Sequence, residues 1–170
     1  SGIWIHGMPY NSDREKFTKG CIALDNNELE NLEKKLDINK TILLTSNGEF
    51  IKASKDEIAL ILSSIFKWKD AWKYSNITEY LSFYSNEFKR ADSSGFFEFS
   101  EQKKRIFAKN EQKIIKFTNI DISPYPNSLG KKMYKALMDE EYLSPSVKFN
   151  GKKELFLEIA NNQVKILSED

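Results

Sequence analysis

The chain contains one histidine, His6, and one cysteine, Cys21, and each has a glycine beside it. Gly7 follows the histidine and Gly20 precedes the cysteine. A thiol becomes a useful nucleophile when an imidazole lies within hydrogen-bond reach and a further group orients that imidazole. A glycine before the cysteine lets the backbone approach a substrate closely and direct its amides at a developing oxyanion. The pair is therefore a candidate for acyl-transfer chemistry.

The same two residues also fit an inert interpretation. Free cysteines are among the most buried residue types and are mostly unreactive. A lone histidine is more often a satisfied group of the core or the surface than a base. Spacing alone leaves both interpretations open and by itself favours the inert one.

The composition limits the classes of function that the chain can have. One histidine and one cysteine are too few for a zinc site of the usual His/Cys type, so we expect no metal and no cofactor. The 26 basic and 25 acidic side chains nearly cancel, which argues against a nucleic-acid-binding protein that works through a bulk positive field. A local basic patch stays open. No apolar run approaches the roughly 20 residues that cross a bilayer, so no membrane-spanning segment is expected.

The first third of the chain is predicted to combine short strands with one helix. Asp25 can cap the first amides of that helix while Glu28 reaches back. Leu29, Leu32 and Leu36 recur at the spacing of one helical face. The expected elements are strands at 3–6 and 21–24, a helix from 25 to about 37, and strands at 40–45 and 49–53.

The rest of the chain is predicted to hold three helices followed by four strands. A capping box of the S-x-x-E kind at Ser54 and Glu57 opens a long amphipathic helix. Asn161 and Asn162 are expected to form the tight turn of the last hairpin. The other expected elements are helices at 78–89 and 98–109 and strands at 113–125, 131–144, 152–160 and 162–169.

Length and element order together predict an α+β protein in two unequal parts. A chain of 170 residues fits one ordinary domain or a small domain that carries part of another. We place the boundary near Ala53, which gives a first unit of 1–53 and a second unit of 54–170. The chain opens directly into the strand-like run IWI, so we expect further residues of the first unit upstream.

The histidine and cysteine segments carry a resemblance to a known family. His6-Gly7, followed after a loop by Thr18-Lys19-Gly20-Cys21-Ile22, resembles the H-G…(S/T)-x-G-C-(I/V)-R signature of the L,D-transpeptidase catalytic domain, also called the YkuD or ErfK/YbiS domain. The resemblance implies that Cys21 is the acylated nucleophile and His6 its base, with the Gly7 carbonyl orienting the imidazole. It also implies oxyanion donors at the amides of Gly20 and Cys21, with Lys19 in the same substrate-facing group.

The match departs from the family pattern at one position. The usual arginine two residues after the cysteine is Ala23 here. Arginine is the planar donor suited to a carboxylate, so its absence puts the usual substrate pose in doubt. The resemblance covers only about the last third of a normal catalytic domain.

A second resemblance lies in the aromatic run of the second unit. The sequence WKDAW at 68–72, followed by Y-L-x-x-Y-S-x-x-F at 80–88, is similar to NTF2-like domains appended to some bacterial members of that family. Such domains are cones of curved sheet wrapped by helices, with a pocket. We expect Trp68, Leu81 and Phe88 in the core. The candidate pocket groups are Tyr84, Tyr134 and Tyr142. The lysines expected to form a solvated face, or else to contact an anionic wall polymer, are Lys103, Lys104, Lys109 and Lys113.

The two resemblances together point to the L,D-carboxypeptidases that trim peptidoglycan in helical bacteria and influence cell shape. They imply a periplasmic enzyme whose partners are peptidoglycan stem peptides and which removes the terminal D-alanine of tetrapeptides. One alternative is an L,D-transpeptidase, which shares the first half-reaction and uses an amine acceptor. Another is a non-catalytic NTF2-like module that binds a glycan or muropeptide. The sequence leaves the acceptor, the pocket ligand and the oligomeric state open.

Overall fold

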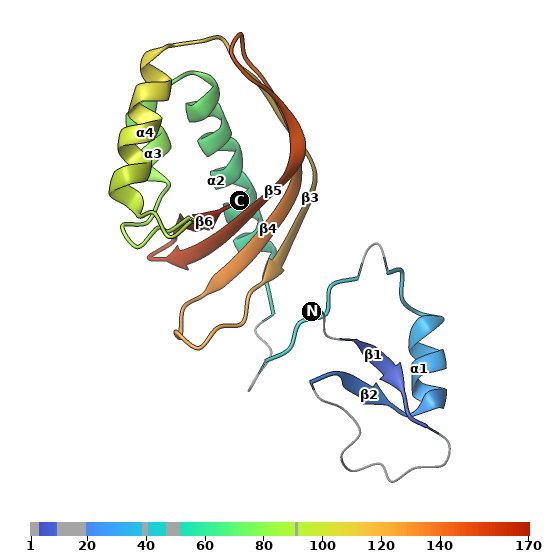
Figure 1. Ribbon diagram of the computed structural model, residues 1–170. Helices are drawn as coiled ribbons and strands as arrows, with labels where there is room; N and C mark the ends of the chain where they lie inside the picture. The colour runs from blue at the N-terminus through green and yellow to red at the C-terminus, as the bar shows by residue number, and fades with distance from the viewer. Residues whose placement is uncertain (1–3, 10–19, 39–40, 47–51, 91) are drawn as a thin grey trace. The chain divides into compact units, whose positions relative to one another are not determined.

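The structure is a computed structural model, and it describes most of the chain in two compact units (Figure 1). The units divide between Leu43 and Leu44, whereas the predicted boundary lies near Ala53. Each unit is described by itself. The described residues are 4–9, 20–38, 41–46, 52–90 and 92–170.

The first unit contains a two-stranded parallel sheet and one helix. Strand β1 (Ile5–Gly7) pairs with β2 (Ile22–Leu24) in a register that sets His6 opposite Ala23. Both strands lie where the sequence predicts them. Helix α1 (Asn26–Glu33) follows β2 directly and is shorter than predicted. Its N-cap is Asp25, whose carboxylate accepts from the Asn27 amide at 3.0 Å, as the sequence predicts.

The prediction of a strand at 40–45 is wrong. Residues 41–46 form no strand, and the side chains of Ile42 and Leu43 are each 56% exposed. An apolar run becomes a strand only where a neighbour takes its hydrogen bonds and a core covers its face, and this segment has neither in the described structure. Of the strand predicted at 49–53, residues 49–51 lie outside the described residues, and the rest is not in a strand.

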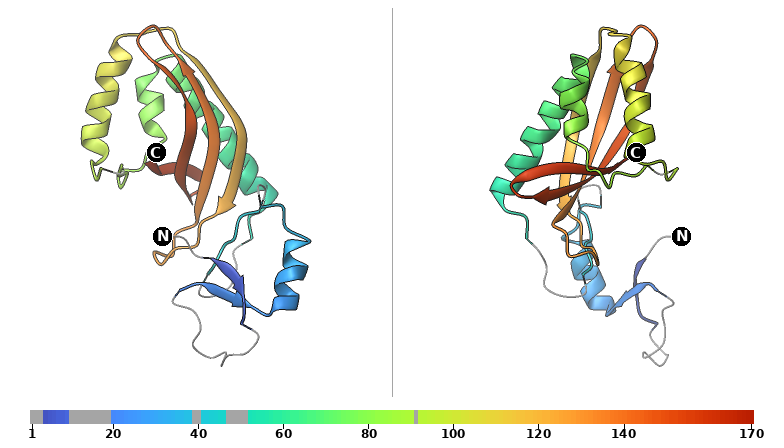
Figure 2. Two further views of the ribbon diagram at one scale, coloured as in Figure 1. Left: turned by 45° about the vertical axis from the view of Figure 1, so that its right-hand side comes forward. Right: turned by 90° about the vertical axis from the view of Figure 1, so that its left-hand side faces the viewer.

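The second unit is a curved antiparallel sheet with three helices along one of its faces (Figures 1 and 2). The strand order is β3-β4-β5-β6, and each strand pairs with its neighbour in sequence. This arrangement confirms the α+β class and the predicted order of three helices and four strands. The elements are α2 (Lys55–Lys73), α3 (Ile77–Ser82), α4 (Phe96–Ala108), β3 (Ile114–Pro124), β4 (Met133–Leu143), β5 (Lys148–Ala160) and β6 (Gln163–Glu169).

Helix α2 begins at the predicted capping box and supplies one wall of the core. The Ser54 hydroxyl accepts from the Glu57 amide at 3.2 Å, and the Glu57 carboxylate accepts from the Ser54 amide at 2.8 Å. One stripe of the helix, which includes Ile61, Ile65 and Trp68, is buried against the sheet.

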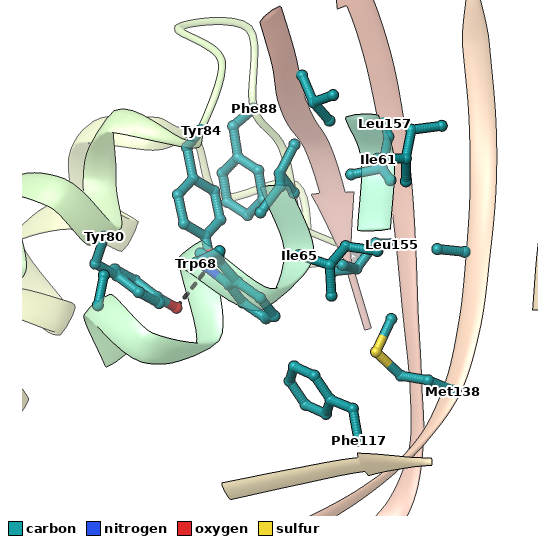
Figure 3. Packing of buried hydrophobic residues seen from close by; sticks show 14 of the residues in the cluster. Ile61, Ile65, Trp68, Tyr80, Tyr84, Phe88, Phe117, Met138, Leu155 and Leu157 are labelled. Carbon is teal, nitrogen blue, oxygen red and sulfur yellow. Dashed lines mark hydrogen bonds between the residues drawn. The ribbon is translucent and has the colours of Figure 1, made fainter. Parts of the chain in front are cut away.

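The core of this unit is built around Trp68 (Figure 3). The indole stacks on Tyr80 at 5.9 Å between ring centres and on Phe117 of β3 at 5.8 Å. Trp68 and Phe88 are buried as predicted, and Leu81 packs against the core while remaining half-buried. The aromatic side chains of α2 and the following segment therefore join the helices to the sheet.

Helix α3 ends at Ser82, well before the predicted end near residue 89. The backbone after Phe83 turns away to pair with strand β6. The Ile166 amide donates to the Phe83 carbonyl at 2.8 Å, and the Ser85 amide donates to the Ile166 carbonyl at 2.9 Å. A partner strand distant in sequence therefore takes over the hydrogen bonds that a longer helix would have used.

The turn between β5 and β6 is the predicted two-residue hairpin. Asn161 and Asn162 have φ angles of 50° and 58°, in the left-handed region that such turns require at both central positions. Asparagine tolerates this region better than most residues. Within the described ranges, no helix is both long and apolar enough to span a membrane.

Candidate functional site

His6 is held by the carbonyl of the next residue. Its Nδ1 lies 2.8 Å from the Gly7 oxygen. A carbonyl oxygen can only accept, so Nδ1 carries the proton and Nε2 is the basic nitrogen of the neutral ring. This geometry is what the sequence resemblance implies for the Gly7 carbonyl.

Cys21 lies immediately before β2 and is half-buried and free of any disulfide. The amide of Ile22 donates to the Trp4 carbonyl at 2.9 Å, which extends the pairing toward the cysteine. Cys21 is two residues from Ala23, the register partner of His6, and side chains alternate along a strand. If the alternation continues one residue back from β2, Cys21 is expected on the same face of the small sheet as His6.

Gly20 adopts a φ of +101°, which L side chains rarely reach. This position therefore requires glycine for its backbone conformation. The turn directs the chain into β2 at the point where the predicted oxyanion donors, the amides of Gly20 and Cys21, are found. Lys19, the third predicted member of this group, lies outside the described residues.

Asn26 is a residue of this site that the sequence interpretation missed. Its Oδ1 accepts from the Met8 amide at 2.9 Å, and its Nδ2 donates to the Met8 carbonyl at 2.9 Å. The run Asp25-Asn26-Asn27 was interpreted only as a helix cap. A side chain that reaches across to another strand leaves no local signal in such a run.

The second unit contains a buried cluster of charges around Glu169, which we call the Glu169 cluster. The Glu169 carboxylate lies 3.3 Å from the Lys153 ammonium and 3.9 Å from the Lys103 ammonium. The Tyr84 hydroxyl donates to the same carboxylate at 2.9 Å. The Glu169 side chain is 4% exposed and each lysine side chain 14%. Because these charges are buried away from water, the free-energy cost of burying each one is offset only by attraction to the others.

Burial and the neighbouring charges shift the pKa values of Glu169, Lys103 and the nearby Glu140 in different directions. Burial raises the pKa of the Glu169 carboxyl, but attraction to Lys103 and Lys153 and the Tyr84 hydrogen bond outweigh it, so the pKa lies below its ordinary value. Burial lowers the pKa of Lys103 despite the nearby Glu169. Burial, with the Glu169 charge added, raises the pKa of the Glu140 carboxyl. Glu169 is therefore the fixed negative charge of the cluster.

The prediction that the lysines form one solvated face is wrong for Lys103 and Lys113. The Lys103 ammonium lies 5.1 Å from the Phe99 ring centre and 5.4 Å from that of Trp72. Lys113 is 3% exposed, and its ammonium donates to Ser75. Both ammonium groups lie inward, because aromatic faces and oxygen acceptors there replace water. Lys104 and Lys109 are exposed as predicted.

A hollow of about 300 Å³ opens beside the Glu169 cluster. It is lined by charged groups of both signs, so a polar or zwitterionic molecule fits its chemistry better than an apolar one. The lining residues are Arg90, Asp92, Lys153, Glu169 and Asp170.

The three tyrosines proposed as pocket groups lie in different surroundings. Tyr84 is in the core, where its hydroxyl also accepts from the Trp68 indole at 3.1 Å. Tyr142 is half-buried and stacks on Trp72 at 5.2 Å. Tyr134 is eight residues earlier on β4, roughly 27 Å away at strand spacing, so these two cannot line one small pocket.

Tyr134 instead borders a second hollow, of about 290 Å³, beside the β3–β4 connection. Its hydroxyl donates to Glu57 at 2.8 Å.

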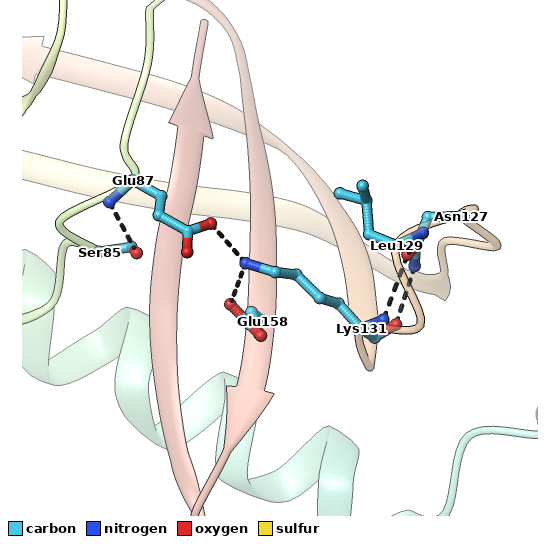
Figure 4. Close-up of polar contacts among 6 residues, drawn as sticks. All are labelled: Ser85, Glu87, Asn127, Leu129, Lys131 and Glu158. Atoms are coloured by element: carbon cyan, nitrogen blue, oxygen red, sulfur yellow. Dashed lines mark hydrogen bonds and ion pairs between the residues drawn. The ribbon is translucent and has the colours of Figure 1, made fainter.

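The Lys131 side chain extends from the β3–β4 connection to two carboxylates, Glu87 at 2.5 Å and Glu158 at 3.3 Å (Figure 4). Two carboxylates thus balance this ammonium, and Asn127 closes the turn by donating to the Lys131 carbonyl at 2.8 Å.

Helices along one face of a curved four-stranded sheet, with a polar cluster enclosed between them, define the second unit as an NTF2-like domain. Residues 60–170 match the family model described as the Cds6 C-terminal NTF2-like domain. This match spans more than half of the chain. The chain therefore belongs to the family of Cds6 C-terminal NTF2-like domains.

Solved structures extend the comparison to both units. The helical cell shape determining protein Pgp2 from Campylobacter jejuni is 43% identical, with a TM-score of 0.88 over 99% of this chain and 60% of that chain. A variant of Pgp2 with one lysine replaced by alanine has a TM-score of 0.91 with the same coverage. This chain thus spans 60% of the length of these relatives.

More distant structures show the fold alone. Bd1075 from Bdellovibrio bacteriovorus is 20% identical, with a TM-score of 0.74 over 100% of this chain and 60% of that chain. An NTF2-like protein from Pseudomonas putida is 11% identical, with a TM-score of 0.55 over 68% of this chain and 85% of that chain. No curated protein sequence matches the chain.

Proposed function

We propose that this chain is part of a peptidoglycan L,D-carboxypeptidase that acts in the control of cell shape, with Cys21 as nucleophile and His6 as base. The observation that carries the proposal is the hydrogen bond from His6 Nδ1 to the Gly7 carbonyl at 2.8 Å. It leaves Nε2 as the nitrogen that can take the thiol proton. The 43% identity to a protein named for determining helical cell shape supports the same role.

The proposed reaction proceeds through a thioester. His6 takes the Cys21 proton, and the thiolate attacks the carbonyl of the L-centre of meso-diaminopimelate in a tetrapeptide stem. The amides of Gly20 and Cys21 stabilise the oxyanion. The carbon–nitrogen bond to the terminal D-alanine breaks, and the amine leaves with the proton from His6. Water, deprotonated by His6, then attacks the thioester, releasing the tripeptide and restoring the thiol.

The substrate sets the expected location and the first experiment. Because the proposed substrate is peptidoglycan, we expect the protein to act in the periplasm. Purified protein is incubated with a defined tetrapeptide muropeptide, and the products are identified by mass spectrometry. We expect the wild type to release D-alanine, and Cys21→Ala and His6→Ala to leave the tetrapeptide unchanged. Release of D-alanine by Cys21→Ala would contradict the proposal.

The same experiment separates the carboxypeptidase from the L,D-transpeptidase. Both form the thioester, but a transpeptidase resolves it with an amine of a second stem peptide instead of water. Cross-linked dimers in the product spectrum would identify the transpeptidase. Tripeptide without dimers at increasing muropeptide concentration supports the carboxypeptidase.

A second candidate function is muropeptide binding by the NTF2-like domain. The buried Glu169 cluster beside a hollow of about 300 Å³ favours it, because fixed charges of both signs suit the amino and carboxyl groups of a stem peptide. Lys153 faces this hollow, whereas its neighbour Lys152 pairs with Asp139 on the other face of β5.

These two lysines form a matched pair for testing the binding. Calorimetric titration with a tetrapeptide muropeptide should show binding weakened about tenfold or more by Lys153→Ala, because one charged hydrogen bond is lost. Lys152→Ala should bind as the wild type does, since its side chain is 65% exposed. Equal effects of the two substitutions would argue against this hollow as the binding site.

A further inference from the structure

Asn26 joins the start of helix α1 to the end of strand β1. The two strands pair as far as Gly7 and Leu24, and the chain then enters the helix after β2. The Asn26 carboxamide both accepts from the Met8 amide and donates to the Met8 carbonyl, each at 2.9 Å. It thus gives Met8 the two hydrogen bonds that a further strand residue would have given.

The carboxamide also explains why residue 7 is a glycine. A Cβ at this position would lie 2.2 Å from Asn26 Oδ1, far inside contact distance. Gly7 lies in a strand and has no left-handed backbone angle, so an alanine would suit its backbone. The requirement at Gly7 is therefore for space, and Asn26 is the side chain that occupies that space.

A rigid connection runs from Asn26 to the imidazole. The Gly7 carbonyl and the Met8 amide belong to one planar peptide group. Fixing the direction of the Met8 N–H therefore fixes the direction of the Gly7 carbonyl, which is the acceptor 2.8 Å from His6 Nδ1. The orientation of the ring depends in this way on the Asn26 side chain through the backbone that joins them.

We propose that Asn26 is a positioning residue for His6, acting through the Gly7–Met8 peptide group to orient the imidazole toward its task as the base of Cys21. The inference rests on the proposed cysteine–histidine function. Asn26 hydrogen-bonds to the backbone of Met8, so its effect is on the geometry of the base.

The test measures the rate of alkylation of Cys21 by iodoacetamide as a function of pH in the full chain. Cys21 is the only cysteine, so the label reports on one site. An unassisted cysteine thiol has its inflection at about pH 8.5, and N-acetylcysteine, measured alongside, is the reference thiol. We expect the wild type to react faster than N-acetylcysteine near neutral pH and to have its inflection at lower pH. A wild type that reacts as N-acetylcysteine does would overturn the proposed function and this inference together.

Asn26→Ala and Asn27→Ala form the matched comparison. Both residues are in the first turn of α1, but Asn27 is exposed and uses only its backbone amide in the cap. Asn26→Ala should slow alkylation near neutral pH by about ten- to a hundredfold and move the inflection toward that of N-acetylcysteine. Asn27→Ala should retain the wild-type profile. A wild-type profile in Asn26→Ala, with a reactive wild type, overturns the inference alone.

Gly7→Ala tests the connection itself through a double-mutant cycle. The added methyl group displaces the Asn26 carboxamide, so Gly7→Ala should slow alkylation as Asn26→Ala does. If both act through one contact, the double variant is no slower than Asn26→Ala alone. Independent effects would multiply, and a rate reduced by the product of the two factors contradicts the inference.

Amide hydrogen exchange of peptides covering 4–9 and 20–38 checks that the first unit remains folded. Wild-type protection outside Met8, together with the altered pH profile, supports positioning over general unfolding. If Asn26→Ala loses protection throughout, Asn26→Asp decides the question, because it keeps an oxygen for the Met8 amide. A folded Asn26→Asp protein with a wild-type profile supports the inference, and one with the profile of N-acetylcysteine overturns it.

Discussion

The two units hold their polar groups by different means. In the first unit, none of the described residues at 4–9, 20–38 and 41–43 is fully buried, and His6 is held by main-chain geometry. In the second unit, the charges of Glu169 and Lys103 lie inside an aromatic core. The first arrangement leaves the imidazole and the thiol half-buried, close to solvent. The second fixes charges in a low-dielectric interior, which suits selective binding.

The largest expected effect is the loss of the indole at the centre of the second unit. Trp68→Ala should lower the free energy of unfolding of this unit by about 4 kcal/mol, because the substitution leaves a cavity between Tyr80 and Phe117. Urea denaturation followed by far-UV circular dichroism measures it. Tyr74→Ala removes an aromatic ring that is 70% exposed and should change stability by less than about 0.5 kcal/mol. Similar costs for both would show that the unit does not depend on this core.

Removing the negative charge of the Glu169 cluster should have the next largest effect. Glu169→Gln removes the carboxylate that pairs with the buried ammonium groups of Lys103 and Lys153, at a cost of about 3 kcal/mol. Glu154→Gln is the matched control, since its pair with Lys135 is about one-third exposed and should contribute less than about 1 kcal/mol. If Glu169→Gln lowers the stability as little as Glu154→Gln does, the charges of the Glu169 cluster are solvated and not buried.

The stability difference between the wild type and Glu169→Gln should depend on pH in a definite direction. The pKa of Glu169 is lowered in the folded state, so its stabilisation is complete above the unfolded pKa of about 4.3 and is lost as the pH falls through the folded value. The stability difference between the wild type and Glu169→Gln should therefore shrink below about pH 4. The pKa of Glu140 is raised by burial in both proteins, but the Glu169 charge adds to that shift only in the wild type, so Glu140 offsets part of the trend there. A difference that grows on acidification would contradict this assignment.

A core substitution in the first unit should cost much less than one in the second. Leu29 of α1 is only half-buried, so Leu29→Ala should destabilise the helix by about 1 kcal/mol. Hydrogen exchange of the α1 amides measures the loss. Leu155→Ala, at a fully buried position of β5, should cost about 3 kcal/mol in the second unit. Equal costs of Leu29→Ala and Leu155→Ala would contradict the contrast between a half-buried position in the first unit and a fully buried one in the second.

The smallest predicted effect is a gain at the last hairpin. Asn162 has a φ of 58°, and glycine reaches this region without the steric cost of a side chain. Asn162→Gly should therefore raise the unfolding free energy by about 0.5 kcal/mol, measured by thermal denaturation. Asn162→Val, which cannot easily adopt a positive φ, should lower it.

Local patterns were enough to predict several elements of this protein. The capping box at Ser54, the strand expected at 131–144 and the turn at Asn161 all depend on neighbours in the sequence, and the structure has each close to where it was predicted. The glycines beside His6 and Cys21 were likewise visible in the sequence. Their exact roles were not, because one needs a left-handed backbone and the other needs space.

The tertiary structure alone decided the features that depend on distant partners. Helix α3 stops at Ser82 because β6 takes over the following hydrogen bonds, and the apolar run at 41–45 pairs with no strand among the described residues. Lys103 is buried because Glu169, at the far end of the chain, returns beside it. Asn26 reaches Met8 only because two strands lie parallel. Periodicity and caps act within a few residues, whereas these contacts join segments that only folding brings together.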